Sequence, residues 1–245
     1  MTVDTDIAVV TGAGSGIGRA ITLRLAADGA RVVAADLNLE AARQTAAEHP
    51  GRIVAMDVDI ADRARVDALR DRVLKDVGTP RVLVNAAGWD CIGPFLDMDA
   101  ATAEKIVTIN YLGPVNLCSA FLPAMAAAGY GRVVNIASDA GRVGSSGETV
   151  YAGAKGGVIA LSKSLAREMV RNGITVNCVC PGPTDTPLFQ SLPEKLRAGL
   201  VKAIPLHRLA QPAEIANAVA FFVRADAGFI TGQVLSVSGG LTMAG

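Results

Sequence analysis

Short apolar stretches alternate with longer stretches of helical periodicity along the chain. The short stretches are rich in Val, Ile and Ala and contain few polar residues, which is typical of strands covered on both faces of a sheet. We predict strands at residues 7–11, 32–36, 53–57, 82–85, 133–137, 175–179 and 234–237. The helical periodicity predicts helices near residues 17–28, 39–48, 64–77, 99–127, 151–171 and 212–224.

The regular alternation of strand and helix predicts a parallel sheet joined by right-handed crossovers. With 245 residues, of which 51% are hydrophobic and 19% charged, the chain can bury a large core and does not have the composition of a disordered protein. No linker, internal repeat or low-complexity tract divides the sequence. We therefore expect one α/β domain over residues 1–245, with a doubly wound parallel sheet of about seven strands and helices on both faces.

A glycine-rich turn, TGAGSGIG at residues 11–18, lies between the first predicted strand and the first predicted helix. Glycines let the backbone approach a pyrophosphate, and a helix N-terminus offers N–H groups and a positive dipole to the anion. A tight connection between strand and helix would also explain the glycines. The expected cofactor contacts in this turn are Gly12, Ser15, Gly16, Ile17 and Gly18.

The second predicted strand ends at Asp36. In a β-α-β unit of this kind, an acidic side chain at that position accepts hydrogen bonds from the adenine ribose and disfavours a 2′-phosphate. The next residues, Leu37 and Asn38, offer no positive charge, so we expect NAD rather than NADP. Two alternatives stay open: Asp36 could merely cap the following helix, and Arg19 or Arg43 could accept a phosphate.

Three more groups of small or polar residues follow predicted strands. The carboxyl ends of parallel strands meet at one edge of the sheet, where open α/β folds bind their ligands. Each group could instead be an ordinary turn, because Asx, Gly and Pro form turns for local reasons. The cofactor contacts expected from these strand ends are Asp57, Val58, Asn85, Ala87, Gly88, Pro181, Gly182, Thr184 and Thr186.

Tyr151 and Lys155 are four residues apart in a predicted helix and therefore lie on one face of it. A free phenol titrates near ~10, and a fixed ammonium about 5 Å away would lower its pKa by on the order of two units. Tyr151 could then exchange a proton with an alcohol or ketone, while Ser138 holds the same substrate oxygen. A Tyr and Lys pair at helical spacing can also be a solvated surface pair.

Asn110 stands four residues before Pro114 in the predicted helix 99–127. Proline has no N–H to donate, so the backbone carbonyl of Asn110 should be free. We expect this carbonyl to hold a water that leads from Lys155 towards solvent, which makes Asn110 the outer member of a proton relay. The alternative is a plain proline kink with a hydrated carbonyl.

Residues 187–210 are long for a connection between helix and strand and mix apolar with basic residues. Such a segment is typical of a mobile lid over a substrate, and we expect it to be one. Near the pocket, the side chains expected to set substrate preference by their shape are Trp89, Asp90, Arg142, Glu148, Leu188 and Phe189.

Charge, cysteine content and the N-terminal region limit the possible partners. Lys plus Arg and Asp plus Glu are both 23, which argues against nucleic acid and an acidic membrane surface as partners. The apolar run at residues 7–10 is too short for a signal sequence or a membrane span, so we expect a cytoplasmic protein. The four cysteines, without C-x-x-C spacing, are expected to be buried thiols rather than ligands of a metal.

These residues together resemble the short-chain dehydrogenase/reductase family, and the resemblance covers essentially the whole chain. It implies a single-domain Rossmann fold, binding of a nicotinamide dinucleotide, and a homotetramer built through the two long helices and the C-terminal strand. It also implies an acid/base role for Tyr151, cofactor binding by Lys155, substrate orientation by Ser138 and water positioning by Asn110. Stretches at 85–90, 138–148 and 227–243 are similar to members that oxidise cyclic or β-hydroxyacyl-CoA thioesters.

We therefore expect an NAD-dependent oxidoreductase that interconverts a secondary alcohol and a ketone, acting on a small molecule that could be a CoA thioester. One alternative is a reductase of 3-oxoacyl groups carried on acyl carrier protein, against which Asp36 argues because such enzymes prefer NADPH. A second alternative is a non-catalytic NAD(H)-binding sensor or scaffold, since a fold does not decide function. The proton-transfer set of Ser138, Tyr151 and Lys155 argues against the sensor.

Overall fold

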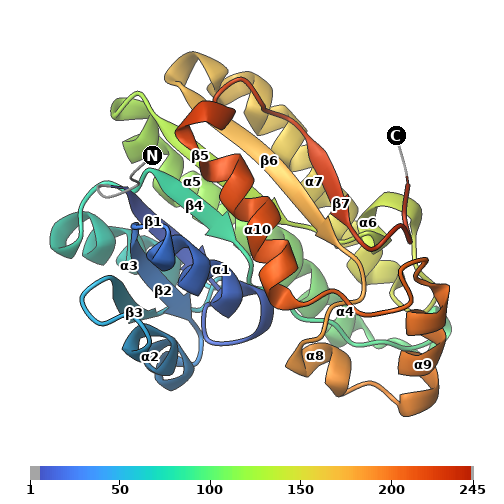
Figure 1. Cartoon of the computed structure of the whole chain (residues 1–245). Coiled ribbons are helices and arrows are strands. Elements are labelled where there is room, and N and C mark those ends of the chain that lie inside the picture. Colours follow the sequence, from blue (N-terminus) through green and yellow to red (C-terminus); the bar gives the residue numbers. More distant parts are fainter. Residues whose placement is uncertain (1–5, 244–245) are drawn as a thin grey trace.

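One seven-stranded parallel sheet runs through the centre of the molecule (Figure 1). The computed structural model describes residues 6–243, and the ends of the expected domain, residues 1–5 and 244–245, lie outside the described residues. The strand order is β3-β2-β1-β4-β5-β6-β7, so the predicted doubly wound sheet is confirmed. The strands are β1 (Ile7–Thr11), β2 (Arg31–Asp36), β3 (Ile53–Asp57), β4 (Val82–Asn85), β5 (Gly131–Ile136), β6 (Ile174–Pro181) and β7 (Val234–Val237).

Helices cover both faces of this sheet (Figure 1). On one face, α1, α2 and α10 bury side chains such as Ile21 and Val219 against the strands. On the other face, α3, α5 and α7 do the same with side chains such as Leu69 and Phe121. These helices are α1 (Gly16–Ala27), α2 (Leu39–Ala47), α3 (Arg63–Asp76), α5 (Gly113–Ala127), α7 (Thr149–Met169) and α10 (Pro212–Val223). Two apolar layers therefore enclose β1, β2, β4, β5 and β6, which are largely buried as their apolar runs predict. The edge strands β3 and β7 are only partly covered.

The strand order reverses between β1 and β4, and the turns after these two strands touch. The Thr11 hydroxyl accepts hydrogen bonds from the backbone N–H groups of Ala86 and Ala87 at 3.1 and 3.3 Å. A Cβ atom added to Gly12 would lie 2.9 Å from the Cα of Ala87, so only glycine allows this approach. The reversal point is where open α/β sheets form their ligand crevice, and it brings the two predicted cofactor turns together.

The predicted helix 99–127 is interrupted by a π-helical turn. The chain forms α4 (Ala100–Val107), a wider turn at Thr108–Leu112 and then α5. Pro114 cannot donate a backbone hydrogen bond, and a wider turn next to it is one way for the helix to continue without that donor. The turn contains Asn110, whose side chain is fully buried.

The stretch Ala100–Ala127 is long and apolar enough to cross a membrane by length and composition alone, with half of its apolar window buried inside the fold. A core helix of a globular protein meets the same criterion. Here α5 lies against the sheet, and its Leu117, Phe121 and Met125 belong to the apolar core. α5 is therefore a core helix of the fold.

Three α-helices of the described chain were not predicted from the sequence. α6 (Ala140–Val143) follows β5, and the segment 187–210 contains α8 (Pro187–Gln190) and α9 (Glu194–Ala203). Proline is favoured at the start of a helix, and Pro187 and Pro193 stand at the beginnings of α8 and α9. The side chain of Thr186 caps α8 by accepting the backbone N–H of Phe189. Residues 187–210 are thus a helical segment beside the crevice rather than an irregular loop.

Candidate active site

The glycine-rich turn after β1 has the tight packing expected of a pyrophosphate-binding turn. A Cβ atom on Gly18 would collide with the backbone of Gly12, so α1 can start this close to β1 only with glycine there. Ser15 precedes the first turn of α1 and is exposed, with no side-chain cap bond of its own. Ile17 is half-buried, and its side chain packs against the core below.

The loop that follows β6 approaches the same turn. A Cβ atom on Gly16 would lie 3.3 Å from the methyl carbon of Thr186. In this loop, Pro181 and Thr184 are buried, while Gly182 and Thr186 are partly exposed. The hydroxyl of Thr184 donates to the carbonyl of Gly182 at 2.9 Å and fixes the loop. The first and last of the predicted cofactor segments therefore face each other across the crevice.

Asp36 lies at the end of β2 and is held by the backbone. One of its carboxylate oxygens accepts the N–H of Gly14 and the other accepts the N–H of Asn38, both at 2.8 Å. The helix cap of α2 is Asn38, whose side chain accepts the N–H of Ala41. The alternative in which Asp36 itself caps that helix is therefore not what the structure contains. Its carboxylate is fixed beside the glycine turn.

The two basic residues that left NADP open are paired with carboxylates. Arg19 forms an ion pair with Glu48, and Arg43 lies 3.6 Å from a carboxylate oxygen of Glu40. All four side chains are well exposed, so these pairs are weak. Both guanidinium groups therefore have a carboxylate partner, but pairs this exposed do not by themselves prevent either arginine from binding a phosphate.

Asp57 at the end of β3 is engaged by two arginines of α3. Its carboxylate oxygens lie 2.7 Å from the Arg65 guanidinium and 2.8 Å from that of Arg72. The hydrogen bond from Arg72, ahead of the other contributions, lowers the pKa of the Asp57 carboxyl. Val58 is buried, and its N–H donates to the carbonyl of Asp36 at 3.0 Å. The side chain of Asp57 thus anchors α3 to β3, a role that the sequence did not suggest.

The turn after β4 is fixed by a buried polar network. The Asn85 amide donates to the side-chain oxygen of Asn135 at 2.6 Å. The side chain of Asn110 donates to the backbone carbonyl of Trp89 at 2.6 Å and accepts the N–H of Trp89 at 3.2 Å. A Cβ atom on Gly88 would lie 2.9 Å from the Asn110 oxygen and 3.5 Å from the ammonium of Lys155. Gly88 therefore keeps open the space in front of Lys155.

Ser138, Tyr151 and Lys155 come together at the carboxyl edge of the sheet. Ser138 follows β5 and hydrogen-bonds to the phenol of Tyr151 near the start of α7. The ammonium of Lys155, one turn further along α7, lies 5.5 Å from the centre of the Tyr151 ring. It also donates a hydrogen bond to the backbone carbonyl of Ile136 at 2.9 Å. The three side chains expected to exchange a proton with substrate are thus adjacent.

The predicted lowering of the Tyr151 pKa by Lys155 is wrong for the protein alone. Burial, followed by the negative charges of Asp90 and Glu148, raises the pKa of Tyr151, and the hydrogen bond from Ser138 opposes this only in part. Burial also lowers the pKa of the Lys155 ammonium, which is 3% exposed, to about 8. The sequence argument counted the attraction between the two groups and omitted the loss of hydration that accompanies burial.

Of the side chains predicted to contact substrate, two lie near Tyr151 and two others have partners elsewhere in the protein. Asp90 and Glu148 lie close to Tyr151 and act on its charge. Trp89 is partly covered by Lys105, whose ammonium lies 3.9 Å from the centre of the indole ring. Arg142 of α6 donates to the hydroxyl of Ser236 on β7 at 2.8 Å and so joins two elements of the fold.

Leu188 and Phe189, on α8, differ in exposure. Leu188 is 50% exposed, whereas Phe189 is 8% exposed and belongs to the interior. Of the four cysteines, Cys118, Cys178 and Cys180 are buried as predicted. Cys91 is exposed, against the prediction, because it lies in the loop after β4 rather than in a strand.

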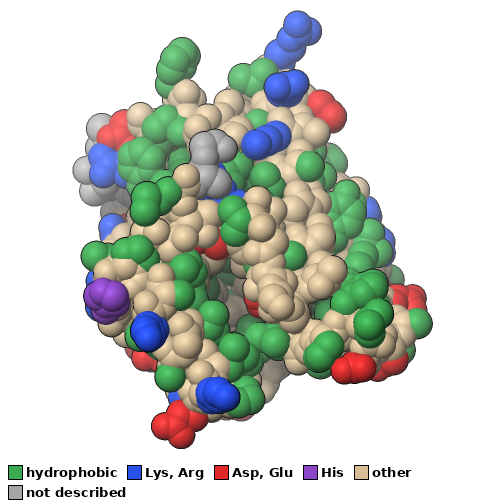
Figure 2. Space-filling model, turned by 90° about the vertical axis from the view of Figure 1, so that its right-hand side faces the viewer, with side chains coloured by type: hydrophobic (Ala, Val, Ile, Leu, Met, Phe, Trp, Pro, Cys, Tyr) green, Lys and Arg blue, Asp and Glu red, His purple; other side chains and the backbone are tan. Residues whose placement is uncertain are grey.

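Figure 2 shows the side of the molecule on which α8, α9 and β7 lie. This face is hollowed near its centre, and hydrophobic side chains gather around the rim of the hollow. Large apolar side chains that remain exposed on the segments around the crevice include Phe95, Leu96, Val143, Leu188 and Leu206. An apolar rim around a polar interior suits a substrate with one reacting oxygen and a larger apolar part.

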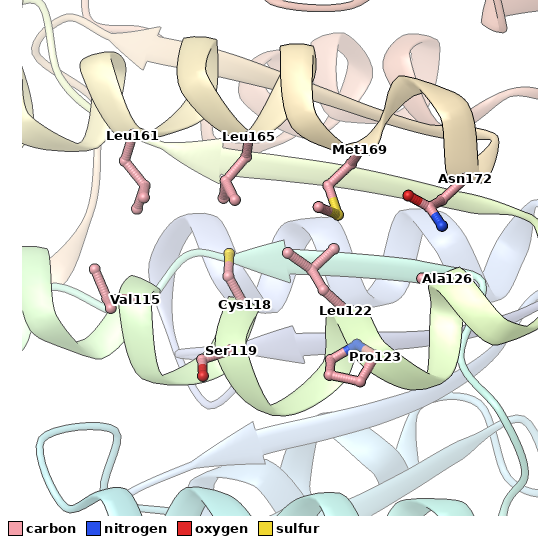
Figure 3. Close-up of a pocket in the computed structure, with 10 residues that line it drawn as sticks. All are labelled: Val115, Cys118, Ser119, Leu122, Pro123, Ala126, Leu161, Leu165, Met169 and Asn172. Atoms are coloured by element: carbon pink, nitrogen blue, oxygen red, sulfur yellow. The ribbon is translucent and has the colours of Figure 1, made fainter.

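A second hollow lies away from this edge, between α5 and α7 (Figure 3). It is a groove of about 460 Å³. Leu161, Leu165 and Met169 of α7 point towards Leu122 and its neighbours on α5. The groove carries no part of the predicted proton-transfer set and is open to solvent along two long helices.

Comparison with known proteins gives full-length similarities. A family model described as Enoyl-(Acyl carrier protein) reductase matches residues 12–242. The chain is 37% identical to (2S)-[(R)-hydroxy(phenyl)methyl]succinyl-CoA dehydrogenase subunit BbsD of Thauera aromatica, over 99% of both proteins. It is 38% identical to (3R)-3-hydroxyacyl-CoA dehydrogenase of Rattus norvegicus, over 97% of this chain and 96% of that one.

Two further similarities carry different functional descriptions. The chain is 34% identical to 3-oxoacyl-[acyl-carrier-protein] reductase FabG of Thermotoga maritima, over 99% of this chain and 100% of that one. A crystal structure described as ribose-5-phosphate isomerase from Brucella melitensis 16M superposes with a TM-score of 0.92 at 37% identity, over 100% of this chain and 96% of that one. From the family model and these full-length relatives, the chain belongs to the short-chain dehydrogenase/reductase family, oxidoreductases that interconvert secondary alcohols and ketones with a nicotinamide dinucleotide.

Proposed function

We propose that this protein is an NAD-dependent dehydrogenase in which Ser138, Tyr151 and Lys155 handle the proton of a secondary alcohol or ketone. The observation that carries the proposal is the contact between the Ser138 hydroxyl and the Tyr151 phenol, with the Lys155 ammonium 5.5 Å from the ring. These groups stand at the carboxyl edge of the sheet, next to the turns that suit a dinucleotide. When bound, the cofactor supplies hydride acceptance or donation.

Each member of the set has a distinct task in this proposal. Ser138 donates a hydrogen bond to the reacting substrate oxygen and orients it. Tyr151 exchanges a proton with that oxygen as the general acid or base. Lys155 holds its positive charge near the phenol and would bind cofactor hydroxyls through the space that Gly88 leaves free. We also propose that the backbone carbonyl of Asn110 holds the first water of a proton path from Lys155.

The raised pKa of Tyr151 makes the two directions of the reaction unequal. A protonated phenol can donate directly to the oxygen of a ketone that is being reduced. Alcohol oxidation requires the phenolate, which burial and the charges of Asp90 and Glu148 disfavour. We therefore expect the reduction to be faster at neutral pH and the oxidation to gain rate as the pH rises.

NAD is the proposed cofactor rather than NADP. Asp36 presents a carboxylate held by two backbone N–H groups at the end of β2, where the adenine ribose would lie. A 2′-phosphate at this position would meet that negative charge, while Arg19 and Arg43 are paired elsewhere. The proposed contacts follow the strand ends already described, from the glycine turn to Thr186.

A CoA thioester of a hydroxy acid is the proposed substrate class. Two of the relatives are described as dehydrogenases of hydroxyacyl-CoA compounds, and both match over nearly the whole chain. The apolar rim at 187–210 and around Phe95 would cover the acyl part, with 187–210 acting as the lid. Arg142 is already bonded to Ser236, so recognition of CoA phosphates would rest on other basic residues.

The second candidate is reduction of 3-oxoacyl groups on acyl carrier protein, which the relative from Thermotoga maritima favours. It has the same chemistry at Tyr151 and differs in the carrier and in the expected cofactor. A non-catalytic NAD(H) sensor is less suited to the chain, because a sensor would not require the adjacent Ser138 and Tyr151. The proposed location of the protein is the cytoplasm.

We also propose a homotetramer in which a second copy covers the groove between α5 and α7. The groove is apolar, and family resemblance implies association through long helices. Leu165→Glu would place a charge in this groove, and light scattering should then find a smaller assembly than for the wild type. Unchanged mass would contradict this part of the proposal.

Activity over a substrate panel tests the proposal. Purified protein is incubated with NAD or NADP and with secondary alcohols, 3-hydroxyacyl-CoA thioesters and their acyl-carrier-protein counterparts, and reduced cofactor is measured. We expect turnover with NAD and a hydroxyacyl-CoA, and its loss in Tyr151→Phe. No turnover in either direction with any substrate, or equal turnover in the variant, would contradict the proposal.

A further inference from the structure

Two carboxyl groups, those of Asp90 and Glu148, meet beside Tyr151. Asp90 lies in the loop after β4, and Glu148 immediately precedes α7. The two side chains are in hydrogen-bonding contact, although neither carboxylate carries a hydrogen when both are ionised. One carboxylate oxygen of Asp90 is fully buried, and no N–H or hydroxyl group of the described residues donates a hydrogen bond to it. Such a contact requires a proton between the two groups.

The remaining bonds of the pair hold it in place. The other oxygen of Asp90 accepts the backbone N–H of Cys91 at 2.8 Å. Glu148 accepts a hydrogen bond from the Ser145 hydroxyl. Nearby, the N–H of Gly93 donates to the carbonyl of Gly147 at 2.9 Å. The loop 89–93 and the segment 145–148 are therefore joined by backbone as well as by the two carboxyl groups.

We propose that Asp90 and Glu148 share one proton in a carboxyl–carboxylate hydrogen bond that fixes loop 89–93 to the start of α7 and sets the electric field around Tyr151. Both residues are positioning residues, because they act on the reaction through Tyr151. The proposal rests on the proposed catalytic role of Tyr151, whereas the shared proton itself does not depend on it.

Burial is the first reason for retaining the proton. It raises the pKa of Asp90 to about 7, and the charge and hydrogen bond of Glu148 act in the same direction. The hydrogen bond from the Cys91 N–H and, less strongly, the positive charge of Lys155 on α7 oppose them. Other titratable groups near the pair include Tyr151, Cys91 next to Asp90, and Cys180, which acts on Tyr151. Lys105 of α4 lies over the ring of Trp89. Below about pH 7 the pair therefore carries about one negative charge, and above it the charge approaches two.

The charge of the pair changes the task of Tyr151. Both carboxyl groups raise the pKa of the phenol through their negative charge. Keeping one proton between them removes part of this effect. When the pair loses that proton, forming the phenolate becomes harder and the contact between the loop and α7 turns repulsive. The protonation of the pair therefore affects both the position of loop 89–93 against α7 and the ionisation of Tyr151.

Unfolding at different pH values tests the shared proton without using activity. The folded protein keeps a proton on the pair up to about pH 7, whereas an unfolded Asp releases it near ~4, so wild-type stability should fall as the pH rises between these values. In Asp90→Asn, the amide donates to Glu148 at every pH. The urea midpoint of this variant, relative to wild type, should therefore rise from about pH 5 to about pH 8. Asp97→Asn, in an exposed part of the same region, should follow the wild type.

The pH profile of alcohol oxidation tests the field around Tyr151. Above about pH 7, where the wild-type pair has lost its shared proton, Asp90→Asn and Glu148→Gln each carry one negative charge fewer than the wild type and keep a hydrogen bond. The rising limb of kcat/KM should therefore move to lower pH by at least about half a unit in both variants. Asp90→Ala should show the same shift together with a higher KM, because the loop loses its bond to α7.

The two experiments separate the possible failures. If the urea midpoints of wild type and Asp90→Asn change in parallel with pH, the shared proton does not exist and the proposal is overturned. If the midpoints diverge as expected but the kcat/KM profiles coincide, the influence on Tyr151 is wrong. A wild type that turns over no substrate would contradict the proposed function instead, while the urea experiment would still decide the shared proton.

Discussion

The two ends of the crevice are built in different ways. The adenosine end is built mainly from backbone atoms. Glycines allow the turns after β1 and β4 to approach each other closely, and two backbone N–H groups hold the carboxylate of Asp36. The catalytic end is built from side chains whose pKa values are shifted. Tyr151 and Lys155 are buried there, and the carboxyl groups of Asp90 and Glu148 lie near Tyr151. A change at the first end should act on structure and cofactor choice, and a change at the second should act on rate.

Gly18→Ala should have the largest structural effect. Its added methyl group would overlap the backbone of Gly12, which cannot move without separating α1 from β1. We expect a loss of about 3 kcal/mol or more in the free energy of unfolding, together with weaker cofactor binding. Urea unfolding and NADH titration would measure both.

Gly199→Ala is the matched control for Gly18→Ala. Gly199 lies in α9, and a Cβ atom there would meet nothing within 4 Å. Alanine favours helix over glycine by about 1 kcal/mol, so the control should be as stable as the wild type or slightly more stable. Equal stability of both variants would mean that the turn after β1 tolerates a side chain.

Lys155→Met should separate activity from stability. Removing the ammonium should lower kcat/KM by on the order of 10²–10⁴, because Tyr151 loses its nearby charge. The same change removes a buried charge, so the melting temperature should stay equal or rise. Exposed Lys163→Met, two turns further along α7, should alter neither quantity.

The stability gain of Lys155→Met should depend on pH. The folded protein releases the Lys155 proton near pH 8, whereas the unfolded chain keeps it to about pH 10. The cost of the buried charge is therefore complete below pH 8 and disappears as the pH approaches 10. A gain that is constant from pH 7 to about pH 10 would contradict the lowered pKa of Lys155.

Asp36→Ala should have the smallest effect on rate and should act on cofactor choice. Hydrogen bonds to a charged group contribute about 1.5–3 kcal/mol, so the preference for NAD over NADP should fall by roughly 10- to 100-fold. The ratio of kcat/KM values for the two cofactors measures this. Asn38→Ala removes the cap of α2 but keeps the carboxylate, and should leave the ratio unchanged.

The adenosine end could be predicted from the sequence because its features are local. The order of strand, glycines and helix fixes the turn at 11–18, and the position of Asp36 follows from the end of the next strand. The strand order is not visible in the sequence, but parallel strands bring all their carboxyl ends to one edge in any order. The predicted residues therefore lie near one another.

For the catalytic end, the sequence predicts the placement of the side chains but not their pKa values. Helical spacing places Tyr151 and Lys155 on one face, and the structure agrees. The direction of the Tyr151 pKa could not be predicted, because it depends on burial and on Asp90 and Glu148, which are 58 residues apart in the sequence. The arginine partners of Asp57 and the π-helical turn at Asn110 likewise depend on contacts that spacing does not reveal.

The most direct test of the account measures cofactor binding and hydride transfer in the same preparations of wild type and Tyr151→Phe. We expect the variant to bind NADH with a Kd within about threefold of the wild type and to lose on the order of 10²–10⁴ in single-turnover rate. Hydride transfer at the wild-type rate in Tyr151→Phe would contradict the central claim that this phenol handles the substrate proton.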